Sequence, residues 1–577
     1  MFAVLLVATR WPLTPWQLFS GDDINFAYAI GRFDIRVSQP QPPGYPVFVL
    51  ETRVLNLLRV KRAESNFRIL ALLGSVAAVW LLVRTGHMIL ERSAGLWAAW
   101  LFLFHPSFWF AGITSPVRVQ LAVVSLAVGG ACWRMLHGNR NWTYWSSLLL
   151  GIGAGIRPEL GLLLLPLWLW CLFRGEPGWA RRLASAGVLA VAVLAWLIPA
   201  SRCTGGLWMF IRVCWVYLAN QSSDTSGLFG ASALQLLAAL GAFTTWTLGG
   251  VPAYALPAML AWTRSTGFGF TRTQILFLLV WLLPLACFAL FVHIGDPGHA
   301  LSMVPVICLA GGRLIERALE RWRNSLSRLE VFALVVFASG LAGFFFRVSH
   351  LQQLLLLPAL SAAAAAMLLY RRRAIAGWLP AWQGGLVLLM PTLFLDAALF
   401  LQPGWYAPPS HTSGVRALLD QFWSDVNIAV SLSNLELVRS VANTDDGALR
   451  QIRERASEKT GQTHVIWVKG LTYWRKVSYY FPGIPVIVVT HKTLSPESPA
   501  TLVLGKGPQA QVIGVGSPPL PLRIPAGERL IWLIKPDEGL GSQLTDRLGA
   551  ICTGAVCFND LPQTHGSRDV GAVRLIW

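Results

Sequence analysis

The stretch GDDINFAYA, residues 21–29, places two adjacent carboxylates, Asp22 and Asp23, directly after an apolar N-terminal segment. The stretch QPQPPGYP, residues 39–46, follows it and holds the chain in an extended bend, because proline fixes its own φ and restricts the residue before it. The next residues, Val47–Arg59, are amphipathic and are expected to lie along a membrane face. A carboxylate near a bilayer and near cations can be poised to take a proton from an attacking hydroxyl.

The composition of the chain is that of a membrane protein. Of its 577 residues, 54% are hydrophobic and 13% are charged, whereas soluble proteins carry about 25% charged residues. The shortage of charge is confined to residues 1–410, and ordinary charge density returns in residues 411–577. We therefore predict a mainly α-helical, polytopic membrane region over residues 1–410, with a first external loop at residues 20–66, and a separate extracytoplasmic α/β domain over residues 411–577.

Apolar segments recur along residues 1–410 and predict about thirteen spans, since a bilayer is crossed by about 20 apolar residues. Beyond a short apolar start at Met1, the expected spans are Phe67–Val83, Ala94–Phe110, Gln120–Trp133, Tyr144–Ile156, Leu160–Leu172, Leu183–Ala200, Ala231–Trp262, Ile275–Val292, Leu301–Gly312, Val331–Phe346, Leu351–Tyr370 and Gly384–Leu401. Arginines concentrate in alternate loops, which places those loops in the cytoplasm. An odd number of spans then places residues 411–577 outside the cytoplasm, in what we expect to be a bacterial inner or plasma membrane.

The net charge of +19 reflects membrane orientation and not nucleic-acid binding. Lys and Arg outnumber Asp and Glu by 30 to 14 before His411, but only by 17 to 14 from His411 onward. An excess of positive charge in short loops between apolar segments fixes their orientation against a bilayer. The lipid bilayer is therefore an expected partner, and nucleic acid is not.

Residues 411–577 carry the alternation of strands and helices that is typical of an α/β domain. The expected strands are His464–Val468, Pro485–Thr490, Thr501–Leu504, Gln511–Val515 and Arg529–Ile534. Ala448–Lys459 is expected to form a helix that starts after Asp445 and Asp446. Cys552 and Cys557 are close enough in sequence to form a disulfide in an oxidising compartment. No Cys/His arrangement has zinc spacing, and we predict no cofactor. A divalent metal at His293, Asp296 and His299 is an alternative that no ligand spacing supports.

The segment from Asp22 to Pro46 resembles the first external loop of the GT-C glycosyltransferases, the superfamily that includes protein O-mannosyltransferases and lipid A aminoarabinose transferases. In these proteins an Asp precedes an aromatic-Ala pair, and a Pro-Pro motif and an amphipathic helix follow. Asp22 stands four residues before Phe26, as the catalytic Asp of the family stands before its aromatic. The resemblance implies that Asp22 is the catalytic base, with Asp23 as a second candidate.

The same resemblance implies roles for other residues of the loop. Gln41 directly precedes the Pro-Pro-Gly-Tyr-Pro motif, residues 42–46. The family usually has His at this position, and this departure leaves the role of Gln41 open. We group Gln41 with Pro43 and Tyr45 as residues that position the loop.

Two later stretches also resemble the family. Residues 151–159 look like its short-span break carrying a cation, Arg157, and residues 293–299 look like a later external loop. A second Asp, which many members have in the next external loop, is missing, since Ala111–Gln120 offers only Ser115, Arg118 and Gln120. The resemblance implies an inverting transfer of a sugar from a polyprenyl-phosphate donor to a hydroxyl of a lipid, glycan or protein acceptor on the outer face. Candidate ligands of the donor phosphate are Arg157, Arg118 and His299.

Each of these interpretations has a simpler alternative. Asp22 and Asp23 can be a solvated loop or a helix cap, and Arg157 with Glu159 can be a structural ion pair at a helix break. His293, Asp296 and His299 can be interfacial residues without chemistry, and Arg118 can be an interfacial anchor. A secondary transporter or lipid flippase is the alternative function, although only Asp396 is a clear acid in the middle of a span and no internal repeat is evident.

Overall fold

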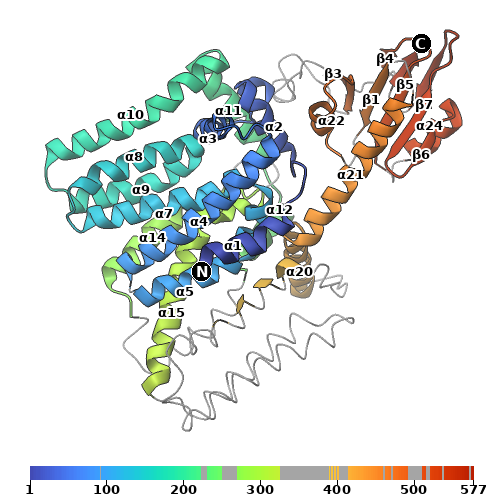
Figure 1. Cartoon of the computed structure of the whole chain (residues 1–577). Coiled ribbons are helices and arrows are strands. Elements are labelled where there is room, and N and C mark those ends of the chain that lie inside the picture. The colour runs from blue at the N-terminus through green and yellow to red at the C-terminus, as the bar shows by residue number, and fades with distance from the viewer. Residues whose placement is uncertain are drawn as a thin grey trace. The chain divides into compact units, whose positions relative to one another are not determined.

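In the computed structural model, helices dominate the N-terminal half of the chain, and the strands of the described residues lie between Thr463 and Ile576 (Figure 1). The described residues are 1–90, 92–222, 226, 230–249, 269–324, 414–458, 462–468, 472–490, 510–514, 520–535, 539–570 and 573–577, with single positions between 389 and 401. These residues fall into two compact units. We call them the helical unit, which is Met1–Thr14, Tyr45–Pro199 and Leu218–Leu437, and the loop–sheet unit, which is Pro15–Gly44, Ala200–Tyr217 and Val438–Trp577.

The described part of the helical unit consists almost entirely of helices. In chain order they are α1 (Phe2–Arg10), η1 (Trp11–Leu13), α3 (Pro46–Leu57), α4 (Ala63–Ile89), α5 (Arg92–Phe104), α6 (Pro106–Thr114), α7 (Pro116–Leu136), α8 (Asn141–Ile156), α9 (Pro158–Gly175), α10 (Trp179–Thr204), α12 (Ala233–Phe243), η4 (Thr244–Leu248), α14 (Arg272–Phe291), η5 (Pro297–Ser302), α15 (Val304–Asn324) and α20 (Gly414–Ser431). Helices α10, α11 (Leu207–Ser222) and α21 (Leu435–Ser457) each cross a boundary between the two units.

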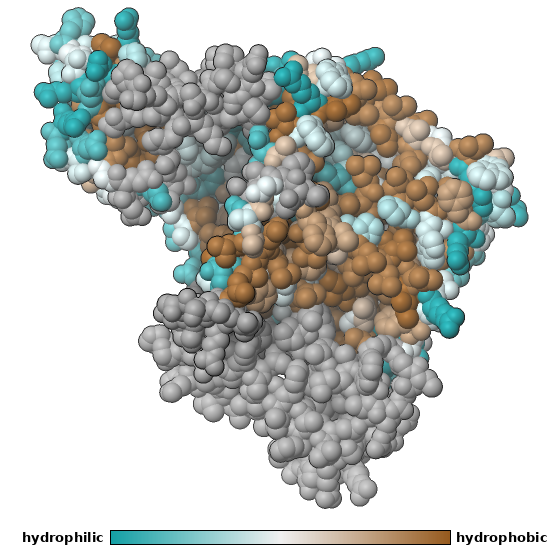
Figure 2. All heavy atoms as spheres, turned by 180° about the vertical axis from the view of Figure 1, so that it is seen from behind, coloured by the Kyte–Doolittle hydropathy of each residue, from teal (hydrophilic) through white to brown (hydrophobic). Residues whose placement is uncertain are grey.

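Five of these helices, α4, α7, α9, α10 and α14, are long and apolar enough to cross a membrane, and α5 with α6 makes a sixth if this pair, bent by 60°, counts as one span. Hydrophobic side chains cover much of the surface of the helical unit on the face that Figure 2 shows. The predicted total of about thirteen spans stays a prediction, because the expected spans Val331–Phe346 and Leu351–Tyr370 lie outside the described residues. Parts of Ala231–Trp262 and Gly384–Leu401 also lie outside them.

Three helices of the helical unit begin at a proline that follows an extended residue. His105, Ser115 and Arg157 precede the N-terminal prolines of α6, α7 and α9. Proline disfavours helical backbone in the residue before it and fits the first helical position, where no N–H is needed. The predicted loop Ala111–Gln120 is shorter than expected, because its residues are helical on both sides of a break at Ser115.

Helix α3 confirms the amphipathic helix expected after the proline-rich stretch. It buries Phe48, Val49 and Thr52, while Leu50 and Leu57 are exposed. An apolar face turned outward on a helix too short to span a bilayer suits the membrane interface.

The loop–sheet unit combines the segment Pro15–Gly44, which we call the first-loop segment, with the C-terminal residues. Its elements are α2 (Gly21–Gly31), η2 (Ile35–Val37), α21 (Leu435–Ser457), β1 (Thr463–Val468), α22 (Trp474–Tyr480), β2 (Val486–Thr490), β3 (Ala510–Gly514), β4 (Leu520–Arg523), β5 (Arg529–Ile534), α24 (Leu540–Leu548), β6 (Ile551–Thr553), β7 (Val556–Asp560), β8 (Ser567–Val570) and β9 (Val573–Ile576). The larger sheet has the order β3-β2-β1-β5-β7-β6, parallel from β3 to β5 and antiparallel from β5 to β6. Its centre is apolar, and Ile466, Trp532 and Leu530 are fully buried.

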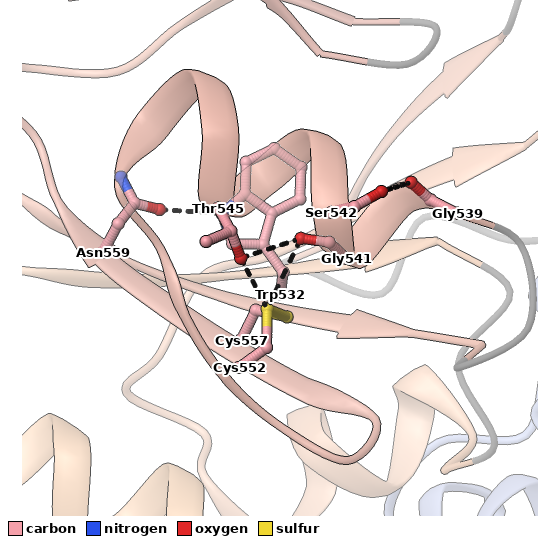
Figure 3. Close-up of a disulfide and its surroundings, with 8 residues drawn as sticks. All are labelled: Trp532, Gly539, Gly541, Ser542, Thr545, Cys552, Cys557 and Asn559. Carbon is pink, nitrogen blue, oxygen red and sulfur yellow. Dashed lines mark hydrogen bonds between the residues drawn. A yellow bond between two sulfur atoms is a disulfide. The ribbon is translucent and has the colours of Figure 1, made fainter.

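Most strands predicted for the C-terminal residues are confirmed, as β1, β2, β3 and β5, while Thr501–Leu504 lies outside the described residues. The expected helix start after Asp446 is wrong, because α21 begins at Leu435, and both acids lie inside it. The disulfide between Cys552 and Cys557 is present and joins paired positions of β6 and β7 (Figure 3).

The compact units do not coincide with the predicted boundary at His411. Helix α20 belongs to the helical unit, where it packs against α12, and the loop–sheet unit resumes only at Val438. The unit also includes the first-loop segment, which the sequence assigns to the membrane region. Long-range contacts, described below, explain this grouping.

Candidate functional site

The two acids of the first-loop segment lie on the first turn of α2, and they have different surroundings. Ser20 is the N-cap, and its Oγ accepts a hydrogen bond from the Asp23 N–H at 3.2 Å. In return, Asp23 Oδ2 accepts from the Ser20 N–H at 2.8 Å and from the Ser20 hydroxyl at 2.9 Å. This reciprocal pair is a capping box, so the simpler interpretation as a helix cap is confirmed for Asp23.

Asp23 is buried, whereas Asp22 next to it is half-buried. Burial raises the pKa of Asp23 to about 6. The hydrogen bonds from Ser20 and the positive charge of Lys476 lower this pKa, whereas the negative charge of Asp22 raises it. Of the two acids, Asp22 is therefore the one whose carboxylate is not taken up by the cap.

A helix of the C-terminal residues packs against this acidic turn within the same unit. Helix α22 contacts α2, and a Cβ built on Gly21 would lie only 2.9 Å from Cε1 of Tyr473. Any side chain at Gly21 would therefore displace the ring of Tyr473. This ring lies close enough to Asp22 for the negative charge of Asp22 to affect the pKa of its phenol. Burial raises the pKa of Tyr473, and Asp22 raises it further, so the phenol stays protonated at neutral pH.

The proline-rich stretch makes a tight turn at the end of the first-loop segment. The Gly44 N–H donates to the Gln41 carbonyl at 3.0 Å, and the peptides before Pro40 and Pro43 are cis. Gly44 has a φ of 101°, and a Cβ there would lie 2.9 Å from Cγ2 of Ile35, so only glycine fits. The side chain of Gln41 is buried, and within the described residues neither its amide nitrogen nor its amide oxygen has a hydrogen-bond partner.

Tyr45 begins the second stretch of the helical unit and is the N-cap residue of α3, with a φ of 46°. Its ring is buried. Gln41 and Pro43 thus shape the turn, and Tyr45 starts the amphipathic helix, which is compatible with the positioning role proposed for these residues.

The candidate phosphate ligands lie in the helical unit, and two of them are arginines with acidic neighbours. Arg157 is extended between α8 and α9, and its Nε lies 3.6 Å from Glu159 Oε2, which is too long for a hydrogen bond. Within the described residues, the buried Nε of Arg157 has no hydrogen-bond partner. Arg118, in the first turn of α7, instead makes a close ion pair with Asp296 at 2.7 Å.

The loop between α14 and η5 brings the two histidines together. The rings of His293 and His299 lie edge to face with centroids 5.4 Å apart. His299 Nδ1 accepts a hydrogen bond from the Gly295 N–H at 3.0 Å, so the neutral ring carries its proton on Nε2, 3.5 Å from Asp296 Oδ2. Burial lowers the pKa of both histidines, to about 4 for His293, and the nearby Arg157 lowers both further.

The structure therefore brings together Arg118, Asp296 and His299 in the helical unit, and it pairs Arg157 with Glu159 there. Asp22, Asp23, Gln41 and Pro43 lie in the loop–sheet unit. Within the described part of the chain, no group of three or more His, Cys, Asp or Glu side chains could hold a metal ion.

Sequence analysis missed Arg475, Lys476 and Asp445, which are buried beside the first-loop segment. A signal was present, because adjacent cations stand in the otherwise aromatic and apolar run TYWRKVSYYF, residues 472–481. Cations amid apolar residues indicate buried partners, but they do not say which partners.

A first prediction concerns the pH dependence of stability. The pKa of Asp23 is raised from 3.8 to about 6 by burial, so the folded protein holds this proton more tightly than the unfolded chain does. The stability that protonation contributes is full below about pH 4 and is lost as the pH rises through 6. Asp23→Asn keeps an acceptor oxygen without the charge. At pH 8 its free energy of unfolding is expected to exceed that of the unmodified protein by about 1–3 kcal/mol.

The measurement is chemical unfolding of both proteins between pH 4 and pH 8, followed by a signal from the loop–sheet unit. Their free energies of unfolding should converge at the acidic end. A difference that stays constant with pH would contradict the assignment.

No protein-family model and no curated protein matches the chain. Among solved structures, it is similar to ArnT from Cupriavidus metallidurans, with 14% identity over 97% of this chain and 96% of that one. The TM-score is 0.56 for ArnT bound to undecaprenyl phosphate and 0.58 for the apo state. The apo oligosaccharyltransferase of Archaeoglobus fulgidus also matches, at 12% identity over 83% of this chain and 62% of that one, with a TM-score of 0.36. The similarity to ArnT spans both units, and the chain therefore has the GT-C fold, as expected from its first loop.

Proposed function

We propose that the protein transfers a sugar from a polyprenyl-phosphate donor to an acceptor hydroxyl on the outer face of the membrane. The observation that carries the proposal is Asp22, a half-buried acid on the first turn of a helix that α22 holds in place. The GT-C fold supports the proposal, because one of the two ArnT structures contains undecaprenyl phosphate. One fold can host many functions, so the chemistry of Asp22 carries more weight than the fold.

In the proposed reaction, Asp22 is the general base. The acceptor hydroxyl oxygen attacks the anomeric carbon from the side opposite the phosphate, and its proton passes to the Asp22 carboxylate. The bond between the anomeric carbon and the phosphate oxygen breaks, and the polyprenyl phosphate leaves with the electron pair. Attack from the opposite side inverts the configuration at that carbon. Asp23 holds the turn that carries Asp22.

The departing phosphate needs fixed positive charge, and Arg157 is the best candidate to supply it. Arg157 is 9% exposed, and the carboxylate of Glu159 is too distant from its Nε for a hydrogen bond. A buried cation with a loose partner is costly unless an anion completes its coordination. We assign Arg118 and the neutral His299 to supporting roles, because Asp296 already contacts both of them.

We also propose that residues 438–577 lie outside the cytoplasm of a bacterium, on the same side as the reaction. The disulfide between Cys552 and Cys557 supports this location, because disulfides persist in oxidising compartments and are rare in the cytosol.

A pair of substitutions tests the donor site. Arg157→Ala is expected to weaken binding of a short-chain polyprenyl phosphate by about 10- to 100-fold, because a hydrogen bond to a charged group contributes about 1.5–3 kcal/mol. Glu159→Gln is expected to tighten binding a few-fold, since it removes a carboxylate that competes with the phosphate. Calorimetric titration of purified protein in nanodiscs measures both changes.

Arg181→Ala is the matched control, because it also breaks an arginine–glutamate pair, with Glu176, away from the proposed site. Its affinity for the lipid phosphate should be unchanged. If Arg157→Ala and Glu159→Gln instead lower the melting temperature equally and leave binding unchanged, the pair is structural, and the proposed donor site is wrong.

A further inference from the structure

Two adjacent cations, Arg475 and Lys476, are buried in α22, and both reach the first-loop segment. The guanidinium of Arg475 donates to Asn25 Oδ1 at 2.7 Å, to the Ser38 carbonyl at 2.9 Å and to the Val37 carbonyl at 2.8 Å. One of these acceptors lies on α2, and the other two are carbonyls at the C-terminal end of η2, those of Val37 and its C-cap residue Ser38. The planar fork of a single arginine thus fixes the spacing between the two halves of the segment.

Lys476 holds the start of the acidic turn. Its ammonium donates to the Phe19 carbonyl at 2.7 Å, one residue before the N-cap Ser20, and to the carboxylate of Asp445 on α21. This lysine therefore links α21 to the residue that precedes the capping box. It also lies close enough to Asp23 to lower its pKa.

Aromatic side chains of α22 complete the contact along the segment. The Leu18 N–H donates to Tyr480 Oη at 3.1 Å, and the ring of Tyr479 packs edge to face on Tyr28, with centroids 5.6 Å apart. Tyr473 packs on Gly21, as described above. Helix α22 therefore contacts the segment before α2, at its first turn and at its C-terminal half.

We infer that α22 is the element that positions the base of the proposed reaction, with Arg475 and Lys476 as positioning residues that hold the turn carrying Asp22. The inference rests on the proposed function and adds a role for the C-terminal residues, which the family resemblance and the comparisons leave unassigned. Helix α22 accordingly supports the proposed catalytic turn without contacting the substrate.

Electrostatics supports positioning over simple packing. Arg475 is 2% exposed, and this burial lowers the pKa of its guanidinium. An apolar side chain of similar size would fill this space without the cost of removing a charge from water. A guanidinium, however, donates several hydrogen bonds in a fixed plane, and here three of its acceptors belong to the segment that carries Asp22.

The test compares Arg475→Ala and Arg475→Lys with the unmodified full-length protein in nanodiscs. Hydrogen exchange of peptides covering residues 18–38 reports the loop without any reference to activity. We expect Arg475→Ala to speed this exchange at least tenfold, while exchange in β1 and β5 stays unchanged. Arg475→Lys should show a smaller increase, because an ammonium can serve only part of the three acceptors.

The kinetic readout is sugar transfer from a short-chain polyprenyl-phosphate sugar. We expect kcat of Arg475→Ala to fall by about 10²-fold, which is the cost of displacing a reacting group by about 1 Å. The KM for the donor should hardly change, because the arginines proposed to bind its phosphate belong to the helical unit. Arg475→Lys should recover part of kcat, which a general loss of folding would not allow.

Arg547→Ala is the control, since Arg547 of the same unit also donates to a backbone carbonyl, that of Asp569, far from the first-loop segment in sequence. It should match the unmodified protein in both readouts. Tyr480→Phe removes one uncharged contact with the segment and should give a smaller exchange effect even if Arg475→Ala does not fold.

The two proposals fail separately. If no donor supports transfer by the unmodified protein, the proposed function is wrong, while hydrogen exchange still tests the anchoring. If the unmodified protein is active and folded Arg475→Ala keeps both its kcat and its slow exchange at residues 18–38, α22 does not position the base.

Discussion

Asp22→Asn is expected to lower the rate of sugar transfer by about 10²–10⁴-fold, the usual contribution of a positioned general base. The substitution keeps the size of the side chain and its capacity for hydrogen bonds, but it removes the basic oxygen that accepts the hydroxyl proton. Affinity for the donor should survive, because losing a negative charge does not weaken attraction for a phosphate. The assay uses purified protein and a short-chain polyprenyl-phosphate sugar.

Asp23→Asn is the paired variant on the same turn. It should cost less activity, because the Asp23 carboxylate caps the helix and is not available to the acceptor. Thermal unfolding of both variants shows whether the protein is intact. Full activity in a folded Asp22→Asn protein would remove the base from the mechanism and would reopen the alternative of a transporter or flippase.

Lys476→Met is expected to lower the free energy of unfolding of the loop–sheet unit by about 3–5 kcal/mol. The substitution keeps the length of the side chain but leaves the Asp445 carboxylate buried without its cation. Burial already raises the pKa of Asp445 despite the nearby lysine, and without the lysine this pKa should rise further. Urea unfolding, followed by the fluorescence of the loop–sheet unit, measures the loss.

The double variant Lys476→Met with Asp445→Asn separates the charge from the contact. Replacing both ions removes the unpaired carboxylate and should recover at least half of the lost stability. If the double variant is as unstable as the sum of the two single variants, the buried pair is not the cause of the loss.

Local rules predict much of the first loop and of the helix boundaries. The acidic pair, Phe26 and the proline-rich stretch indicate a GT-C loop and an amphipathic helix at Val47–Arg59, and α3 is found there. The predicted break at Arg157 is also confirmed, because a proline follows it and proline acts on its immediate neighbour. Strands β1 and β5 follow from short apolar runs in the same way.

The partners of the acidic turn could not be predicted from local sequence. Arg475 binds Asn25 across 450 residues of sequence, and no local pattern specifies a contact at that distance. The expected helix start at Asp445 and Asp446 failed for a related reason. An acidic pair is typical of a helix N-terminus, but here Asp445 faces Lys476 from inside α21. An acidic pair can cap a helix or pair with a distant cation, and only the tertiary structure shows which of these roles it has.

The sequence distance between α2 and α22 also bears on how the protein is made. Ribosomes add about 5–20 residues per second, so the 450 residues between Asn25 and Arg475 take about 20–90 s to synthesise. During that time the acidic segment has left the ribosome, but the helix that anchors it does not yet exist. A chain that stalls or is cut before Arg475 would retain the complete GDDINFAYA motif without its anchor. The order of synthesis thus delays assembly of the proposed active site until nearly the whole chain has been translated.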